Sequence, residues 1–413
     1  MRDQSLQSSQ IVFPVDLHPE LHQAQDESAT GPLAGWGWLE IFVLVQVLWG
    51  VLLFVPGSQG YRIYIRGFPY VTSLAALIAC LRNTGVESKA PGASWILASL
   101  AVMVAGLAHP ATWLMSGIAQ VVFQLAIAAP VFWTATHWIS AERLDRILLL
   151  VFGANFLGAA VGLLQVYFPA TFMPPEFSRL ALSLNADVVG ALTYIGADGR
   201  EIIRPPGLSD IPGGAAVSAT VTALLGFAFA TRAQATPKLR LAFLLAAMIG
   251  LTVGYLTQVR SMLVMLVLCM GAAGAVRLRT GRIVHTAWIV GAGAAMVLAS
   301  FAWAVAVGGD SVLDRFQSML DQGVVSSYQE NRGIFLTYTL QELLYEYPFG
   351  AGMGRWGMMA AYFGEPTNWR FPGLWAEIQL TGWLYDGGLL LCICYVTAIG
   401  AAVHHTYKIA IST

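Results

Sequence analysis

Two arginines stand at the edges of long apolar stretches of this chain, where a cation is unusual. Arg204 lies in the run RPPGLSDIPGG just before one apolar stretch, and Arg260 ends the short turn between two later ones. A guanidinium group is a planar fork that grips phosphate oxygens bidentately, so two converging arginines suit a diphosphate. The alternatives are an ion pair of Arg204 with Glu201 or Asp210, and an Arg260 that only extends its charge to the membrane surface.

Two acids, Glu377 and Asp386, lie near the start of the last apolar stretch, WAEIQLTGWLYDGGLLLC. In a helix they would be separated by about 900° of rotation and point to opposite faces, so they do not form an acid/base couple. Glu377 is a candidate general base at the outer surface, with capping of the last helix as the alternative. Asp386 would lie about 13 Å deeper along the helix. An isolated charge is expensive there, so we expect a structural residue that is either protonated or paired.

A glycine-rich segment, EYPFGAGMGRWG, precedes these acids. Such a loop can offer backbone amides to phosphate, or it can form a plain tight turn. Arg355 within it and Arg332 in SYQENRGIF are further candidate phosphate ligands, and otherwise both are solvated loop charges. The two large polar loops of the chain, 169–210 and 308–375, contain no Asp-x-Asp motif or histidine cluster. The sequence therefore predicts neither a metal site nor a cofactor.

The composition places these residues in a membrane protein. Charged residues make up 11% of the chain and hydrophobic residues 57%, with a mean hydropathy of +0.65. Soluble proteins carry about 25% charged residues, and no soluble core could hide this much apolar surface. The net charge of -1 gives no signature for binding a polyanion, so nucleic acid is not an expected partner. All four cysteines fall inside apolar runs and read as packing residues.

The predicted fold class is an all-α, polytopic integral membrane bundle of about ten transmembrane helices. A helix needs about 20 apolar residues to cross a bilayer. Ten segments meet or approach that length: 37–55, 67–82, 93–109, 112–136, 147–168, 211–231, 241–258, 261–276, 283–307 and 376–402.

Basic residues predict which side each loop faces, because Lys and Arg are retained in the cytoplasm. If the N-terminus is inside, the short outside loops hold only Arg62, Arg66 and Arg260. The inside segments then hold twelve basic residues: Arg2, Arg82, Lys89, Arg143, Arg146, Arg232, Lys238, Arg240, Arg277, Arg279, Arg282 and Lys408. We therefore predict two cytoplasmic termini.

The polar segments around the predicted helices are unequal in length. Residues 1–35 are predicted to be a disordered cytoplasmic tail, and 36–413 the transmembrane domain. Two large loops, 169–210 and 308–375, would lie outside, and loops of this length are usually functional or disordered. The second loop includes a predicted amphipathic helix over 333–347, which would lie either on the membrane surface or packed within the loop.

In order and spacing, four segments of the chain together resemble the O-antigen ligase and O-antigen polymerase (Wzy-like) superfamily of bacterial membrane proteins. The resemblance covers roughly residues 145–403. RPPGLSDIPGG is similar to the family's R-x-x-G segment, and TQVRSMLVML to its T-G-S-R-x-x-x-L-x-L turn. NRGIFLTYTLQELLYEYPFGAGMG is similar to R-x-x-x-W…P-x-x-G-x-G-x-G, and EIQLTGWLYDGGLL to H-N-x-x-L-x-x-L-x-E-x-G.

The resemblance implies an enzyme of the bacterial inner membrane. Members transfer a glycan from an undecaprenyl-diphosphate-linked saccharide to an acceptor glycan or lipid, on the periplasmic face and without a nucleotide. By position, Arg204 and Arg260 would bind the carrier diphosphate, and Arg332 matches the arginine that opens the large-loop helix. Glu377 stands where many members have histidine, and Asp386 falls on the acid of the E-x-G motif.

Two departures from the family pattern keep other functions open. The histidine is replaced by Glu377, and Val259 stands where the family has serine. The chain is therefore expected to be a glycosyltransferase of polysaccharide biosynthesis, with Glu377 as its base. The alternatives are a polysaccharide or lipid transporter, and a non-catalytic scaffold that binds other polysaccharide-assembly proteins.

Overall fold

A computed structural model describes most of the chain. The described ranges are 37–83, 90–136, 139–177, 192–232, 235–279, 283–321 and 334–412. The predicted N-terminal tail, part of the first large loop and Arg332 therefore lie outside the described residues.

Long apolar helices dominate the described part of the chain, as expected for an all-α membrane protein. Seven of them are long and apolar enough to cross a membrane. They are α3 (Arg62–Asn83), α5 (Leu114–Trp133), α6 (Ala141–Tyr167), α10 (Pro237–Leu256), α11 (Arg260–Arg279), α12 (Ile283–Gly308) and α18 (Gln379–Ser412).

Three shorter apolar helices occupy the remaining predicted segments. They are α2 (Trp38–Leu48), which continues as the 3₁₀ turn η1 (Trp49–Phe54), α4 (Ala93–Gly106) and α9 (Ala215–Ala230). The membrane class is thus confirmed, and the apolar helices fall where the sequence predicts them.

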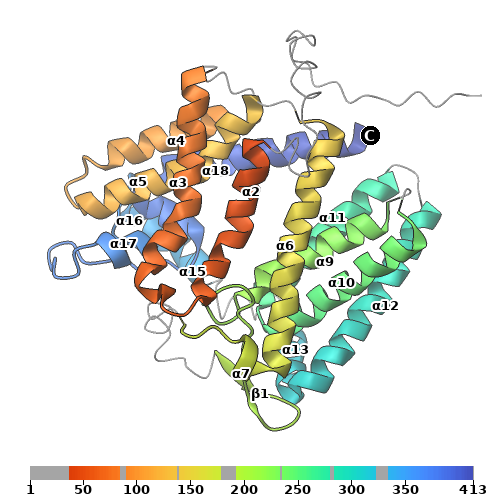
Figure 1. The fold of residues 1–413 in the computed structure, drawn as a ribbon. Coiled ribbons are helices and arrows are strands. Elements are labelled where there is room, and N and C mark those ends of the chain that lie inside the picture. Colours follow the sequence, from red (N-terminus) through yellow and green to blue (C-terminus); the bar gives the residue numbers. More distant parts are fainter. Residues whose placement is uncertain are drawn as a thin grey trace, which may run out of the picture.

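The helices pack in two neighbouring groups (Figure 1). Helices α9 to α12 lie together with α6 beside them, while α2 to α5 and α18 form the other side. Small residues permit close contact between α9 and α10. A Cβ added at Gly250 would lie 2.7 Å from the carbonyl oxygen of Ala219, and one at Gly226 would lie 2.9 Å from that of Phe243.

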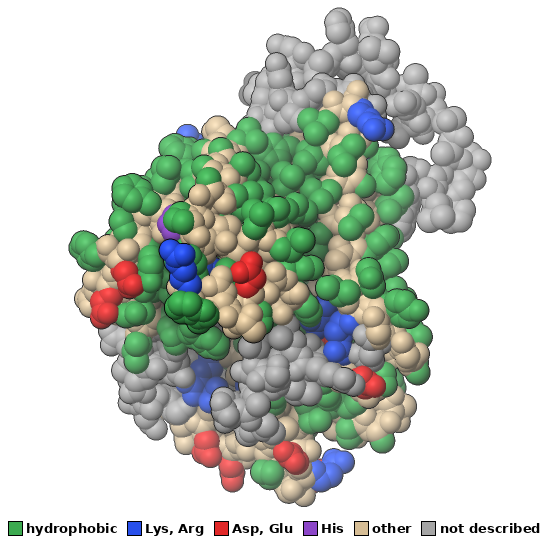
Figure 2. Space-filling view, turned by 90° about the vertical axis from the view of Figure 1, so that its left-hand side faces the viewer, with side chains coloured by type: hydrophobic (Ala, Val, Ile, Leu, Met, Phe, Trp, Pro, Cys, Tyr) green, Lys and Arg blue, Asp and Glu red, His purple; other side chains and the backbone are tan. Residues whose placement is uncertain are grey.

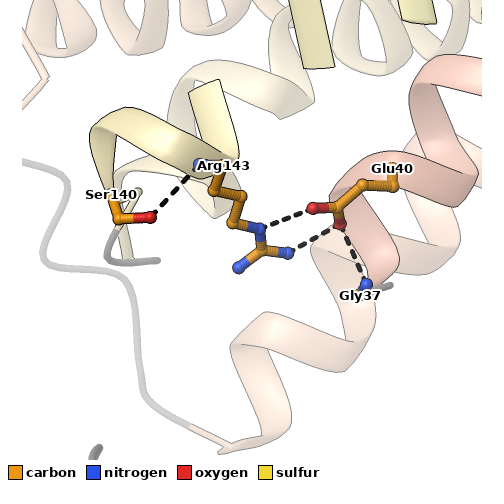
Figure 3. A network of polar contacts seen from close by, with 4 residues as sticks. All are labelled: Gly37, Glu40, Ser140 and Arg143. Atoms are coloured by element: carbon orange, nitrogen blue, oxygen red, sulfur yellow. Dashed lines mark hydrogen bonds and ion pairs between the residues drawn. The ribbon is translucent and has the colours of Figure 1, made fainter. Parts of the chain in front are cut away.

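Polar contacts define two opposite ends of the bundle. At one end, Arg143 at the start of α6 donates two hydrogen bonds to Glu40 at the start of α2, at 2.7 and 2.8 Å (Figure 3). Arg232 pairs with Asp145 at the same end, at 2.8 and 2.9 Å. We call this end, where α2 begins, the tail end. Arg143 and Arg232, two of the basic residues predicted to lie inside, are thus both found at this end.

The opposite end, here called the loop end, carries residues of both large loops. A two-stranded antiparallel hairpin, β1 (Thr193–Ile195) and β2 (Glu201–Ile203), lies there beside helix α13 (Asp310–Asp321) (Figure 1). The space-filling view shows hydrophobic side chains over most of the upper half, with the visible acidic side chains at mid-height and below, toward the loop end (Figure 2). This distribution fits an apolar surface that contacts lipid, above an end that carries polar groups.

The predicted helix over 333–347 is present, with a π-helical turn inside it. It runs as α15 (Ile334–Tyr338), the π turn η6 (Thr339–Leu343) and α16 (Leu344–Glu346). The hydroxyl oxygens of Thr339 and Thr381 lie 2.5 Å apart, so the helix packs on the first turn of α18. Leu343 is buried as well, whereas Ile334 and Tyr345 are exposed. A further short helix, α17 (Gly357–Phe363), follows.

The last helix, α18, is broken at Gly387 and Gly388. Gly388 has a φ of +67°, a left-handed conformation that glycine adopts without strain. The glycine-rich segment fills the break: Leu389 donates its amide to the carbonyl of Pro348 at 2.9 Å, and Ala351 donates to that of Tyr385 at 2.8 Å. Backbone groups freed by the break are therefore satisfied within the protein, as a membrane interior requires.

Candidate functional site

Arg204 is held by backbone hydrogen bonds directly after strand β2. Its amide donates to the carbonyl of Leu192 at 3.0 Å, and its carbonyl accepts from the amide of Gly213 at 2.9 Å. The side chain is half-buried, and its Nε has no hydrogen-bond partner among the described residues. A buried guanidinium donor without an acceptor is unusual in a folded protein.

Arg260 is the first residue of α11, after a turn of three residues that reverses the chain from α10. The turn needs a left-handed residue, and Gln258 supplies it with a φ of +54°. Gln258 is buried, and its side-chain nitrogen has no hydrogen-bond partner among the described residues. A Cβ added at Gly213 would lie 3.5 Å from the Val259 side chain and 4.0 Å from that of Arg204. The α10–α11 turn and the Arg204 segment are therefore neighbours.

A third arginine, Arg315 on α13, joins these two. Burial lowers the pKa of Arg315, and the charges of Arg260 and Arg204 lower it further. Burial also lowers the pKa of Arg204, and the charge of Arg260 lowers it further. The three guanidinium groups are thus close enough to repel one another. We call Arg204, Arg260 and Arg315 the arginine cluster.

The hairpin places α13 so that Arg315 reaches the cluster. Ala197 of the hairpin donates its amide to Val307 at the end of α12, at 3.1 Å. Ser311 in the first turn of α13 donates its hydroxyl to the carbonyl of Ile195 at 2.8 Å. Gly309 makes the sharp turn between the two helices with a φ of +65°, and its backbone approaches Ala197 too closely for a side chain.

Tyr194 supplies a neutral polar group to the same place. Its ring lies against Gly308, its hydroxyl is buried, and no described residue hydrogen-bonds to it. Burial raises the pKa of Tyr194, so the phenol stays protonated and is able to donate. Three like charges, with the unsatisfied donors of Arg204, Tyr194 and Gln258 among them, form an environment that an anion would stabilise.

The alternative ion pair of Arg204 with Asp210 is wrong. Asp210 is held instead by two arginines of α3: Arg62 Nε lies 2.6 Å from Oδ2, and Arg66 Nη2 lies 2.5 Å from Oδ1. No ion pair joins Arg204 to Glu201 either, among the residues that the structure describes. Neither of the two carboxylates near Arg204 in the sequence therefore neutralises its charge.

Glu377 lies two residues before α18 and is half-buried. Within the described ranges, no hydrogen bond or ion pair connects it to the arginine cluster, and none caps α18. The structure therefore brings the three arginines together but does not bring Glu377 to them. Its role as a base remains a prediction.

Arg355 is neither a solvated loop charge nor part of the arginine cluster. It is 6% exposed. Its Nε and Nη2 donate to the carbonyl of Pro372 at 3.0 and 2.8 Å, and its Nη1 donates to that of Ala351 at 2.6 Å. These bonds tie the segment before α18 to the glycine-rich segment, which is a structural role. Arg332, the remaining candidate, lies outside the described residues.

The glycine-rich segment uses its amides within the protein. Met353 donates its amide to the hydroxyl of Thr112 at 3.0 Å, and Gly350 donates to the carbonyl of Tyr347 at 3.1 Å. A Cβ added at Gly354 would lie 2.3 Å from the amide nitrogen of Gly117. These glycines therefore allow close packing, and of the two alternatives the structure favours a packed turn over a phosphate cradle.

Asp386 has the partners that its sequence position could not reveal. Trp356 donates its indole N–H to Oδ1 at 2.9 Å, and Gln120 of α5 donates to Oδ2 at 3.4 Å. Both partners are neutral donors, which is how a buried carboxylate is stabilised without a counter-charge. The expected structural role of Asp386 agrees with this arrangement.

Comparison with known proteins adds nothing to this geometry: no family model, no curated protein and no solved structure matches the chain.

Sequence reasoning missed Arg315, Tyr194 and Gln258. The signal for α13 is present, because apolar residues recur at helical spacing in DSVLDRFQSML and leave Arg315 on the polar side. No comparable signal identifies Tyr194 or Gln258, since their burial follows from the packing of the hairpin and of the α10–α11 turn.

Proposed function

We propose that this chain is a membrane glycosyltransferase of the O-antigen ligase/polymerase type. It transfers or polymerises a saccharide carried on undecaprenyl diphosphate, with a glycan or lipid as acceptor, in surface or exopolysaccharide biosynthesis. The arginine cluster at one end of a membrane bundle is the observation that carries the proposal. A diphosphate at a membrane surface is the anion that such a cluster suits best.

The chemistry requires one bond to form and one to break. The acceptor hydroxyl attacks the anomeric carbon of the donor sugar, and the bond between that carbon and the phosphate oxygen breaks. The leaving diphosphate keeps the electron pair and gains negative charge. Arg204, Arg260 and Arg315 stabilise that developing charge, and fixed cations of this kind are usually the largest catalytic contribution. Glu377 takes the proton of the acceptor hydroxyl.

The finer topology belongs to the same proposal. The seven long and three shorter apolar helices make ten crossings, with both termini in the cytoplasm of a bacterial cell. The loop end, with the arginine cluster, then faces the periplasm. The basic residues gathered at the tail end support this orientation, because Lys and Arg accumulate on the cytoplasmic side.

One feature favours a transporter as the second candidate. Transporters bind their substrates at broken helices in the membrane, and α18 is broken beside the buried Asp386. Here, however, the glycine-rich segment fills the break, and both carboxylate oxygens of Asp386 accept hydrogen bonds from neutral donors. The arginine cluster therefore argues more strongly for the transferase than the break does for a transporter.

The deciding experiment uses the purified full chain in lipid nanodiscs with an undecaprenyl-diphosphate-linked oligosaccharide and an acceptor glycan. A transferase releases free undecaprenyl diphosphate in many turnovers and lengthens or modifies the acceptor. A transporter releases none but moves the labelled donor across the bilayer of a reconstituted vesicle. A scaffold does neither, and that result would reject the proposal.

A further inference from the structure

The segment that carries Arg204 is closed into a compact loop. The amide of Gly213 donates to the carbonyl of Arg204 at 2.9 Å, and that of Ala215 donates to the carbonyl of Pro205 at 3.2 Å. We call residues 204–214 the arginine loop. Closing the loop on itself leaves its position in the bundle to be set by contacts with the helices around it.

One of these contacts comes from α6. Gln165 is fully buried; its Oε1 accepts from the amide of Gly207 at 2.8 Å, and its Nε2 donates to the carbonyl of Gly207 at 2.9 Å. Gly207 has a φ of +63°, and a Cβ there would lie 2.8 Å from the carbonyl oxygen of Gly158. This point of the loop is therefore pressed against α6.

The second contact comes from α3, at the other side of the loop. Arg62 and Arg66 are one helical turn apart and each engages one oxygen of Asp210, at 2.6 and 2.5 Å. The Asp210 side chain is 1% exposed. Breaking a buried pair of this kind leaves an uncompensated charge and is strongly unfavourable.

We propose that Asp210, clamped by Arg62 and Arg66, is a positioning residue that holds Arg204 in the arginine cluster. With both carboxylate oxygens engaged by α3, Asp210 fixes the arginine loop without neutralising the Arg204 charge. A single arginine on α3 would leave one oxygen available to Arg204, which lies on the same short loop. This inference rests on the proposed anion site and deepens it.

One substitution changes the affinity for an anion in opposite directions under the two explanations, positioning and simple electrostatics. Asp210→Asn removes a negative charge near an anion site, and on electrostatic grounds alone an anion should bind more tightly. Positioning predicts the opposite, because a displaced guanidinium loses part of its bidentate hydrogen bonding to the anion. The measurement is calorimetric titration of the full chain in nanodiscs with inorganic pyrophosphate. We expect binding that is about tenfold weaker, which is about the loss of one hydrogen bond to a charged group.

A double-mutant cycle tests whether Asp210 acts through Arg204. If it does, the Asp210→Asn/Arg204→Lys variant binds pyrophosphate no more weakly than Arg204→Lys alone, because coupled residues do not add. Glu40→Gln is the matched control: it removes an equally buried carboxylate that an arginine grips at the tail end (Figure 3). This control should leave pyrophosphate binding unchanged.

A milder variant distinguishes loss of positioning from a folding defect. Arg66→Lys keeps the charge on α3 but loses the fork, so it should weaken binding in the same direction with the protein at normal abundance. Unchanged or tighter binding in Asp210→Asn, or additive effects in the cycle, would overturn the proposal. Binding does not depend on turnover. If pyrophosphate binding follows the cycle but no donor is consumed, the positioning role stands and glycosyl transfer is rejected.

Discussion

The indole nitrogen of Trp356 lies 2.9 Å from Oδ1 of Asp386, and this bond fastens the glycine-rich segment to the break in the last helix. Replacing Trp356 with Phe leaves a buried carboxylate oxygen without its closest donor. We expect the free energy of unfolding to fall by about 1–3 kcal/mol. Thermal unfolding in detergent measures this, with Trp369→Phe as the control, since that indole is 90% exposed. Equal melting of the two variants would contradict the role.

Gly388 is expected to be the least replaceable glycine of α18. Its φ is +67°, and a Cβ there would lie 2.2 Å from the carbonyl oxygen of Pro348. Gly388→Ala should therefore destabilise the protein by about 1–3 kcal/mol or more, or prevent its accumulation. Gly400 lies in the same helix with nothing within 4 Å of an added Cβ. Gly400→Ala should be neutral or stabilising by up to about 1 kcal/mol, because alanine favours a helix interior. Similar abundance and melting for both variants would count against the packed break.

Each arginine of the cluster is expected to resist replacement by lysine. Lysine keeps the charge but loses the bidentate fork, so Arg204→Lys, Arg260→Lys and Arg315→Lys should each lower turnover by about 100-fold. Release of undecaprenyl diphosphate by the purified variants measures this effect. Arg232→Lys is the control, because Arg232 makes a bidentate pair at the tail end. Full activity of the Arg315 variant would remove α13 from the site.

Glu377 is expected to act on the proton and not on the diphosphate. Glu377→Gln keeps the shape but loses the base, so turnover should be abolished while pyrophosphate binding stays unchanged. Glu377→His should retain part of the turnover, since histidine is also able to accept a proton. Normal turnover in the Gln variant would mean that the base lies elsewhere.

The orientation of the bundle can be tested with single cysteines. A cysteine at Asp198, exposed in the hairpin at the loop end, should react with a membrane-impermeant maleimide added to intact spheroplasts. A cysteine at Ala235, before α10 at the tail end, should react only after the membrane is opened. The parent protein for this test lacks the exposed Cys269. The reverse pattern would invert the topology.

The sequence alone determined the membrane class, the positions of the apolar helices and the candidacy of Arg204 and Arg260. Helices in a membrane satisfy their backbone hydrogen bonds within each segment, so local composition is enough to find them. Consecutive membrane helices run in opposite directions, so each loop is assigned to one end of the bundle or the other. This assignment predicted that Arg204 and Arg260 would lie at the same end.

Only the tertiary structure decided which polar groups meet. Gln120 and Asp386 are 266 residues apart in the chain, and Arg66 and Asp210 are 144 apart. Such contacts depend on how each helix is rotated and which helices are neighbours, and no local pattern encodes either. For the same reason, the sequence did not show that Arg355 is buried and bonded to the carbonyls of Ala351 and Pro372. Arg315 went unnoticed because it reaches the cluster only through the hairpin packed beside α13.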